Sequence, residues 1–135
     1  MMNQRGSASL ELTLMTPVLL VFLLLVVAGG RLTVARSDLN ASAREGARVA
    51  SLARTPQQAQ IAAEAAIAAS LAARQLSCRS PVYTVDAGEL RPGGTVTASV
   101  RCEVSFADLT LLPLPASKTM TARFTEVVDT YRQVS

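Results

Sequence analysis

The chain has 135 residues and a formal net charge of +3; half of its residues are hydrophobic, and it contains two cysteines and no histidine. This composition argues against histidine-based acid–base catalysis, Ser–His and Cys–His nucleophiles, and most zinc sites. The basic excess is too dilute, and the aromatic residues too few, for a nucleic-acid surface. We therefore expect a protein that is not an enzyme, with no catalytic residue, cofactor, metal site or nucleic-acid partner.

The chain begins with a short polar leader followed by a long apolar run. Residues 1–6 form the leader, which ends in Gly6, and residues 12–30 carry no charged side chain. A helix needs about 20 apolar residues to cross a bilayer, so we expect residues 7–30 to be a transmembrane helix in contact with membrane lipid. Glu11 lies near its start. Either it sits among lipid headgroups or it has a functional partner, because a carboxylate at the centre of a membrane helix costs roughly 2.5–3.5 kcal/mol.

The helical pattern continues past the apolar run. Residues 31–54 contain no proline and no cluster of turn residues, so we expect them to extend the membrane helix. Leucine and small side chains recur there every seven residues, a pattern that suits close packing between helices. The members of this helix-packing stripe are Leu32, Leu39, Gly46 and Ala53.

Residues 55–77 are expected to form a second helical segment, with the helix itself over residues 56–76. Thr55, Pro56 and Gln58 match a capping box with proline at the first helical position. The segment is rich in alanine, and its few larger apolar groups are Ile61, Ile67, Leu71 and Leu76. Two interpretations remain open: a helix packed through a modest area, or a partly exposed and frayed one.

From residue 78 onward the hydrophobic period changes from helical to two, which predicts β structure over residues 78–135. Residues 95–106 alternate apolar and polar side chains and form the clearest strand. Further strands are expected at residues 81–87 and 118–128, and a glycine- and proline-rich turn at residues 88–94. We therefore predict a membrane-anchored α+β chain, in which a small three-stranded antiparallel sheet packs on the alanine-rich helix.

The sequence midpoint between Cys78 and Cys102 is position 90, inside the predicted turn, so the two cysteines could face each other across the hairpin. A disulfide there would contribute roughly 3–4 kcal/mol by the chain-entropy estimate and would require an oxidising compartment. The alternative is two buried free thiols. The arginines that follow the apolar run favour a cytoplasmic C-terminal part by the positive-inside rule, whereas a disulfide favours the opposite side.

Two short segments resemble a known family. Residues 6–11, GSASLE, stand directly before an apolar helix and resemble the class III signal of type IV prepilins. Residues 43–48, AREGAR, are similar to a segment of the TadE-like minor pseudopilins of tight-adherence (Tad/Flp) pilus systems. The proline in the apolar run, the alanine-rich helix and the β-rich end extend this resemblance over essentially the whole chain.

The resemblance implies cleavage between Gly6 and Ser7 by a membrane prepilin peptidase acting from the cytoplasm. Ser7 would then begin the mature chain, and Glu11 would be its fifth residue. The carboxylate of Glu11 could pair with the new α-amine of a neighbouring subunit, which would offset the desolvation cost of the buried charge.

The implied localisation is the bacterial cytoplasmic membrane, with a single pass, a cytoplasmic N-terminus and an extracytoplasmic C-terminal part, either in the pilus or at its base. The implied partners are the prepilin peptidase, other pilins or pseudopilins and the pilus assembly machinery. The implied function is assembly or initiation of a Flp-type pilus for surface adhesion. Two other hypotheses remain open: a secreted module released by signal peptidase near Gly30, and a single-pass anchored module unrelated to pili.

Overall fold

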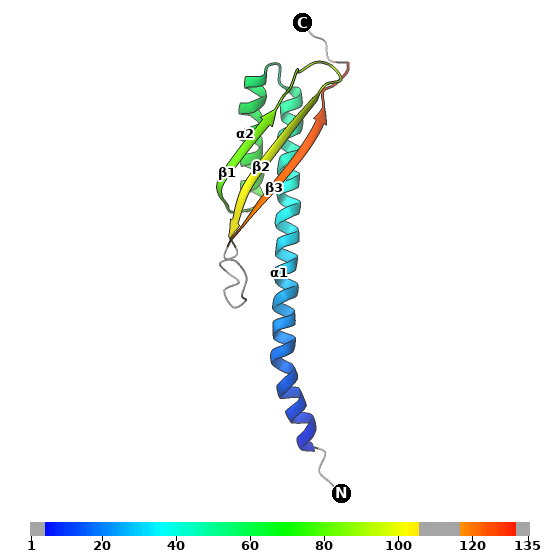
Figure 1. Cartoon of the computed structure of the whole chain (residues 1–135), viewed down its shortest axis with the longest axis vertical. Helices are drawn as coiled ribbons and strands as arrows, with labels where there is room; N and C mark the ends of the chain where they lie inside the picture. The colour runs from blue at the N-terminus through cyan, green and yellow to red at the C-terminus, as the bar shows by residue number, and fades with distance from the viewer. Residues whose placement is uncertain (1–4, 106–116, 132–135) are drawn as a thin grey trace. The chain divides into compact units, whose positions relative to one another are not determined.

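A computed structural model of the chain describes residues 5–105 and 117–131, in which two helices are followed by three strands (Figure 1). The elements are α1 (Arg5–Leu52), α2 (Pro56–Ala73), β1 (Cys78–Asp86), β2 (Thr95–Ser105) and β3 (Ser117–Val127). The predicted α+β class and the order of its elements are confirmed. The chain divides into two compact units, Met1–Thr33 and Val34–Ser135.

The first unit contains the apolar part of α1. By length and composition, this helix contains a segment able to cross a membrane. The segment has a mean hydropathy of 2.6, and none of it is buried within the chain. Most of its large apolar side chains are exposed, as Leu12 at 70% and Phe22 at 64% illustrate, whereas Leu24 and Leu32 are half-buried. An apolar surface of this extent needs an apolar environment, either lipid or the helices of other proteins.

Polar groups inside this apolar segment are satisfied locally. The hydroxyl of Thr13 donates to the carbonyl oxygen of Ser9 at 2.8 Å, and the hydroxyl of Thr16 donates to the carbonyl oxygen of Leu12 at 2.7 Å. Such bonds let threonine enter an apolar medium without an unpaired donor. Pro17 lies within the helix and has no N–H to offer the preceding turn, the type of defect that membrane helices tolerate.

The start of α2 follows the predicted capping pattern. Thr55 has extended backbone angles, and its hydroxyl accepts a hydrogen bond from the N–H of Gln58 at 3.2 Å. Pro56 occupies the first turn, where its missing N–H breaks no helical hydrogen bond. One side of the helix is buried through Ala59, Ala63, Ile67 and Leu71. The helix is therefore packed, which decides between the two interpretations of this alanine-rich segment.

The end of α2 lies three residues before the predicted position. Gln75 adopts a left-handed backbone with a φ of 55°, and its N–H donates to the carbonyl of Ala72 at 3.0 Å. The N–H of Leu76 then donates to the carbonyl of Leu71 at 3.1 Å. These two bonds form a Schellman motif, which usually has glycine at the left-handed position. Because glutamine occupies it here, the hydrophobic period alone did not reveal where the helix ends.

The sheet is antiparallel in the order β1-β2-β3, so β2 is its central strand. Along β2 the side chains alternate, and one face is buried through Val96, Ala98, Val100, Cys102 and Val104. In the second unit, α2 and the part of α1 from Val34 onward cover this face (Figure 1). The predicted strand 95–106 corresponds to β2 except for Phe106, which lies outside the described residues.

Strand β1 begins earlier than predicted because it contains a bulge. Arg79 pairs with Glu103 and Val82 pairs with Arg101, so the two residues Ser80 and Pro81 lie opposite a single residue of β2. Ser80 has a φ of 48°. Proline cannot donate to a ladder, and a bulge on an edge strand is a position where a sheet accommodates it.

Candidate functional site

The residues predicted for processing and assembly lie in the first turns of α1. Gly6 and Ser7 belong to this helix, and the side chain of Glu11 is exposed. Because Ser7 and Glu11 are four residues apart in one helix, they lie on the same face. Within the part of the chain that the structure describes, Glu11 has no hydrogen bond or ion pair. A carboxylate on an uncovered apolar surface must find its partner outside the chain once that surface is buried.

The four residues of the helix-packing stripe lie in different surroundings. Leu39 is 1% exposed, and Gly46 is buried against α2. Ala53 follows the end of α1 and is packed against the core. Leu32 belongs to the first unit and is half-buried. In the second unit, the stripe is thus filled by this chain's own core, which also buries four alanines of the same helix: Ala35, Ala43, Ala47 and Ala50.

Gly46 lets Ile67 of α2 pack close to the backbone of α1. A Cβ atom at this position would lie 2.5 Å from Cγ1 and 2.7 Å from Cδ1 of Ile67. Carbon atoms in contact are normally about 3.5–4.0 Å apart, so the isoleucine occupies the space that a side chain at position 46 would need. Gly46 of the AREGAR segment therefore has a packing role within the chain.

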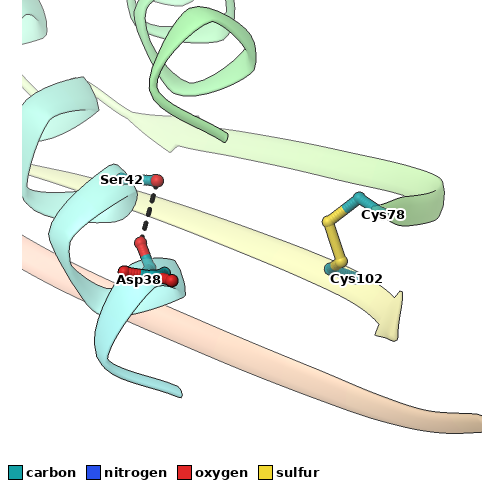
Figure 2. The surroundings of a disulfide bond; sticks show 4 residues. All are labelled: Asp38, Ser42, Cys78 and Cys102. Atoms are coloured by element: carbon teal, nitrogen blue, oxygen red, sulfur yellow. Dashed lines mark hydrogen bonds between the residues drawn. A yellow bond between two sulfur atoms is a disulfide. The ribbon is translucent and has the colours of Figure 1, made fainter. Parts of the chain in front are cut away.

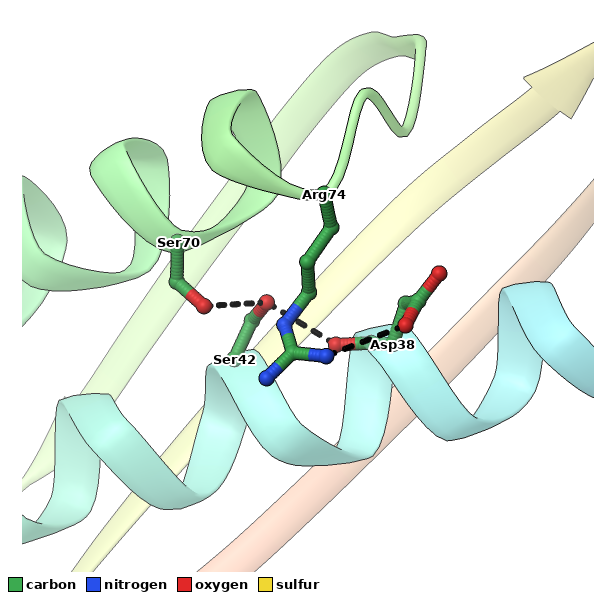
Figure 3. A network of polar contacts seen from close by, with 4 residues as sticks. All are labelled: Asp38, Ser42, Ser70 and Arg74. Carbon is green, nitrogen blue, oxygen red and sulfur yellow. Dashed lines mark hydrogen bonds and ion pairs between the residues drawn. The ribbon is translucent and has the colours of Figure 1, made fainter.

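A small polar network joins the same two helices (Figure 3). The hydroxyl groups of Ser42 and Ser70 are 3.0 Å apart, and Ser42 also donates to the backbone carbonyl of Asp38 at 2.9 Å. Arg74 forms an ion pair with the Asp38 carboxylate at 3.1 Å. Sequence analysis did not identify these residues. The available signal was Ser42, a serine among the alanines of α1, whose hydroxyl meets a polar group of α2.

Arg44 connects α1 to the sheet. Its guanidinium carbon lies 5.4 Å from the centre of the Phe124 ring on β3. A cation over an aromatic face contributes about 0.5–1 kcal/mol when the site is exposed. The AREGAR segment thus contacts both layers of the second unit, α2 through Gly46 and the sheet through Arg44.

Cys78 and Cys102 form a disulfide between β1 and β2, with Cα atoms 5.3 Å apart (Figure 2). Their expected position directly opposite each other is wrong, because Cys78 pairs with Val104. Cys102 faces the bulge instead, so the bridge runs diagonally across one face of the sheet. The reason is the position of the turn: Asp86 pairs with Thr97, so the hairpin is centred between residues 91 and 92 and not at residue 90.

Tyr83 on β1 has a phenol whose pKa is raised. Burial raises the pKa of its phenol above the ordinary value, and the negative charge of Glu64 raises this pKa further. Within the described residues, no group of three or more histidine, cysteine or acidic side chains could hold a metal ion.

Residues 6–48 match the model of a family described as TadE-like protein. This segment is TadE-like. The match confirms the resemblance seen in residues 6–11 and 43–48, and it begins at the glycine expected to precede the cleavage site. Comparisons with curated proteins and with solved structures returned no match.

The TadE-like segment extends across both structural units. Its first part is the exposed apolar surface of α1, and its last part, from Val34 to Arg48, builds the core of the second unit through Leu39, Ala43 and Gly46. The contacts of the second part lie within the chain. The buried side chains of the second part are therefore not available to other molecules, whereas most of the large apolar side chains of the first part are exposed.

Proposed function

We propose that this protein is a membrane-anchored minor pseudopilin, without enzymatic activity, that acts in the assembly or initiation of a Flp-type pilus used for surface adhesion. The observation that carries this proposal is the TadE-like match over residues 6–48. The resemblance to minor pseudopilins of tight-adherence pilus systems links such a segment to pilus assembly. The matched segment includes Gly6, Ser7 and Glu11 together with the apolar run.

Processing would create the chemistry that assembly needs. Cleavage between Gly6 and Ser7 leaves a positively charged α-amine one helical turn from Glu11. When the apolar surface of α1 leaves water, this carboxylate is stabilised by the amine of a neighbouring subunit, since an unpaired charge in an apolar medium is costly. The exposed leucine, valine and phenylalanine side chains of residues 10–27 supply the surface on which pilin helices or lipid pack.

The proposed orientation places the N-terminus in the cytoplasm and the second unit outside it. The disulfide between Cys78 and Cys102 supports this orientation, because such bonds persist in oxidising compartments. The proposed partners are the prepilin peptidase, other pilins or pseudopilins and the assembly machinery.

Mass spectrometry of the mature N-terminus tests the processing step. Co-expression with a prepilin peptidase should yield a chain that begins at Ser7, and the variant Gly6→Leu should remain uncut. A chain that begins near Arg31 would instead support release by signal peptidase. A chain that keeps its first methionine in the presence of an active peptidase would support a simple membrane anchor. Either result rejects the pseudopilin proposal.

The role of Glu11 is tested separately from processing. We expect Glu11→Ala to be cleaved normally but to fail in assembly, measured as pilus yield in a cell that carries the complete system. The matched control is Leu10→Ala, a truncation one position away on the same exposed surface, which should preserve assembly. Normal pilus yield from the Glu11→Ala variant would show that the amine–carboxylate pairing is not required.

A further inference from the structure

The two edges of the sheet differ. The β1 edge is interrupted by the bulge at Ser80 and Pro81, a combination that hinders pairing with another strand. The β3 edge has no such protection: its 11 residues pair with β2 in continuous register, and they include no proline. Among the described elements, no strand pairs with the outer side of β3.

The ladder determines which backbone groups of β3 face outward. The N–H of Val128, next to the end of β3, donates to the carbonyl of Gly94 at 2.8 Å, on the β2 side. In an antiparallel ladder, the residues whose N–H and C=O groups face the partner strand alternate. The N–H and C=O groups of the even-numbered residues of β3 therefore point toward β2. Thr119, Thr121, Arg123 and Thr125 direct their N–H and C=O groups toward the open edge.

A groove of about 270 Å³ lies along one half of this edge. Its walls are residues 118–122 of β3 and, on α1, Arg36, Leu39 and Asn40. Because five consecutive residues of β3 line it, the groove follows the edge of the strand and not one of its faces. All of these residues belong to the second unit.

The lining of the groove has a definite chemistry. Leu39 and Met120 are nearly fully buried, at 1% and 6% exposed, and form an apolar wall. Arg36 and Lys118 are exposed cations, and no acidic residue lines the groove. Neither cation forms an ion pair with another described residue. A ligand for this groove would therefore combine an extended backbone, a small apolar side chain and a carboxylate.

We propose that this groove binds an extended acidic segment of a partner protein, which joins the sheet as a fourth strand beside β3. The outward N–H and C=O groups of Thr119 and Thr121 provide the main-chain hydrogen bonds of this binding mode. Alternate side chains of the segment face the Leu39–Met120 wall, and a carboxylate meets Arg36 and Lys118. The proposal goes beyond the pilus function and does not depend on it.

A second copy of this chain is a less suitable occupant. Antiparallel pairing of two β3 strands about Ala122 would place Lys118 opposite Glu126 of the second copy, which is favourable in charge. Residues 122–126 of the second copy, which would then lie opposite residues 118–122, contain Arg123 as well as Glu126 and so carry no net negative charge.

The test uses the full chain in detergent micelles with a labelled pentapeptide of alternating valine and glutamate. Two matched probes replace glutamate by lysine or carry N-methyl groups on alternate residues, which removes the backbone donors. We expect the glutamate peptide to bind at least about tenfold more tightly than either matched probe, the ratio that 1.4 kcal/mol produces. Amide hydrogen exchange at Thr119 and Thr121 should slow when it binds.

Two sets of variants locate the site. Thr121→Pro removes one outward N–H and should weaken binding at least about tenfold, a loss of 1.4 kcal/mol. Thr125→Pro, the same change on the same edge beyond the groove, should leave binding unchanged. The double variant Arg36→Glu/Lys118→Glu should bind the lysine peptide better than the glutamate peptide. This reversal stays informative even if proline at residue 121 impairs folding.

Four results would overturn the proposal. The first two are no peptide binding up to about 1 mM, which corresponds to 4.1 kcal/mol, and equal binding of acidic and basic peptides. The third is slow exchange at Thr119 and Thr121 before any peptide is added, which would mean that the chain itself covers the edge. The fourth is a concentration-dependent dimer abolished by Thr121→Pro, which would identify a second copy as the occupant.

Discussion

Gly46 offers the sharpest test of how α1 and α2 pack, because its substitution by alanine has two opposing effects. Alanine is favoured over glycine inside a helix by about 1 kcal/mol, so Gly46→Ala on an isolated helix would be stabilising. In this fold, the added methyl group would lie 2.5 Å from Cγ1 of Ile67. Ile67 is fully buried, and its branched side chain has one strongly preferred rotamer in a helix, so it cannot rotate away.

The second effect is expected to be the larger one. Insertion of a methyl group into a filled site costs about 1–3 kcal/mol. With the helix-propensity gain subtracted, Gly46→Ala should lower the free energy of unfolding by about 1 kcal/mol. In the Ile67→Ala background, both close carbon atoms are absent. There the same substitution should raise the free energy of unfolding by up to about 1 kcal/mol, so its sign should reverse.

The measurement is chemical unfolding of the full chain in micelles, followed by circular dichroism for the four members of this double-mutant cycle. Ile67→Val, which removes only Cδ1, should recover part of the loss if Ile67→Ala proves too unstable to measure. Gly30→Ala is the control, since no atom lies within 4 Å of its added Cβ and the unfolding of the second unit should not change. Equal stabilisation by Gly46→Ala in both backgrounds would refute the close contact between the helices.

Three further predictions concern the second unit. Gln75→Gly should raise the free energy of unfolding by about 1 kcal/mol, because glycine adopts the left-handed φ of 55° without strain; an unchanged unfolding midpoint would contradict the Schellman ending of α2. Cys78→Ser/Cys102→Ser should lower the free energy of unfolding by roughly 3–4 kcal/mol, and a reductant should then have no further effect, whereas it should destabilise the parent chain. Stability should fall as the pH rises above about 10, because the pKa of Tyr83 is raised in the folded state and the unfolded chain loses the proton first. An ultraviolet titration in the Tyr131→Phe background follows Tyr83 alone, and Glu64→Gln should lower its pKa; no change on that substitution would contradict the effect of the Glu64 charge.

Most of the fold could be predicted because its signals are local. The apolar run, the capping pattern at Thr55 and the strict alternation of residues 95–105 each depend on neighbours in sequence. The differences lie where the backbone leaves the regular helical or extended conformation. The left-handed Gln75 ends α2 early, and the bulge at Ser80 and Pro81 shifts the register of β1. The side chains of Gln75 and Ser80 do not reveal in the sequence that these residues have a positive φ.

The candidate sites divide in the same way. Gly6, Ser7 and Glu11 are recognisable because their spacing from the apolar run is itself the signal. The Asp38–Arg74 pair and the Ser42–Ser70 contact are not, because each joins residues from two helices whose relative register becomes known only after they pack. The groove beside β3 is harder still to predict from the sequence, because its prediction requires knowledge of which sheet edge remains open.

The internal packing of α1 determines which surfaces remain for partners. In the second unit, the space beside Gly46 is occupied by Ile67 of α2, so neighbouring subunits cannot pack against Gly46 without unfolding this unit. The two proposed contact surfaces, the apolar surface around Glu11 and the β3 groove, differ in what they require. Pairing through Glu11 needs the α-amine that processing creates, whereas strand addition at β3 needs only a folded sheet. An uncut Gly6→Leu variant should therefore lose pilus assembly while it still binds the acidic peptide, and loss of both would mean that the two surfaces are coupled.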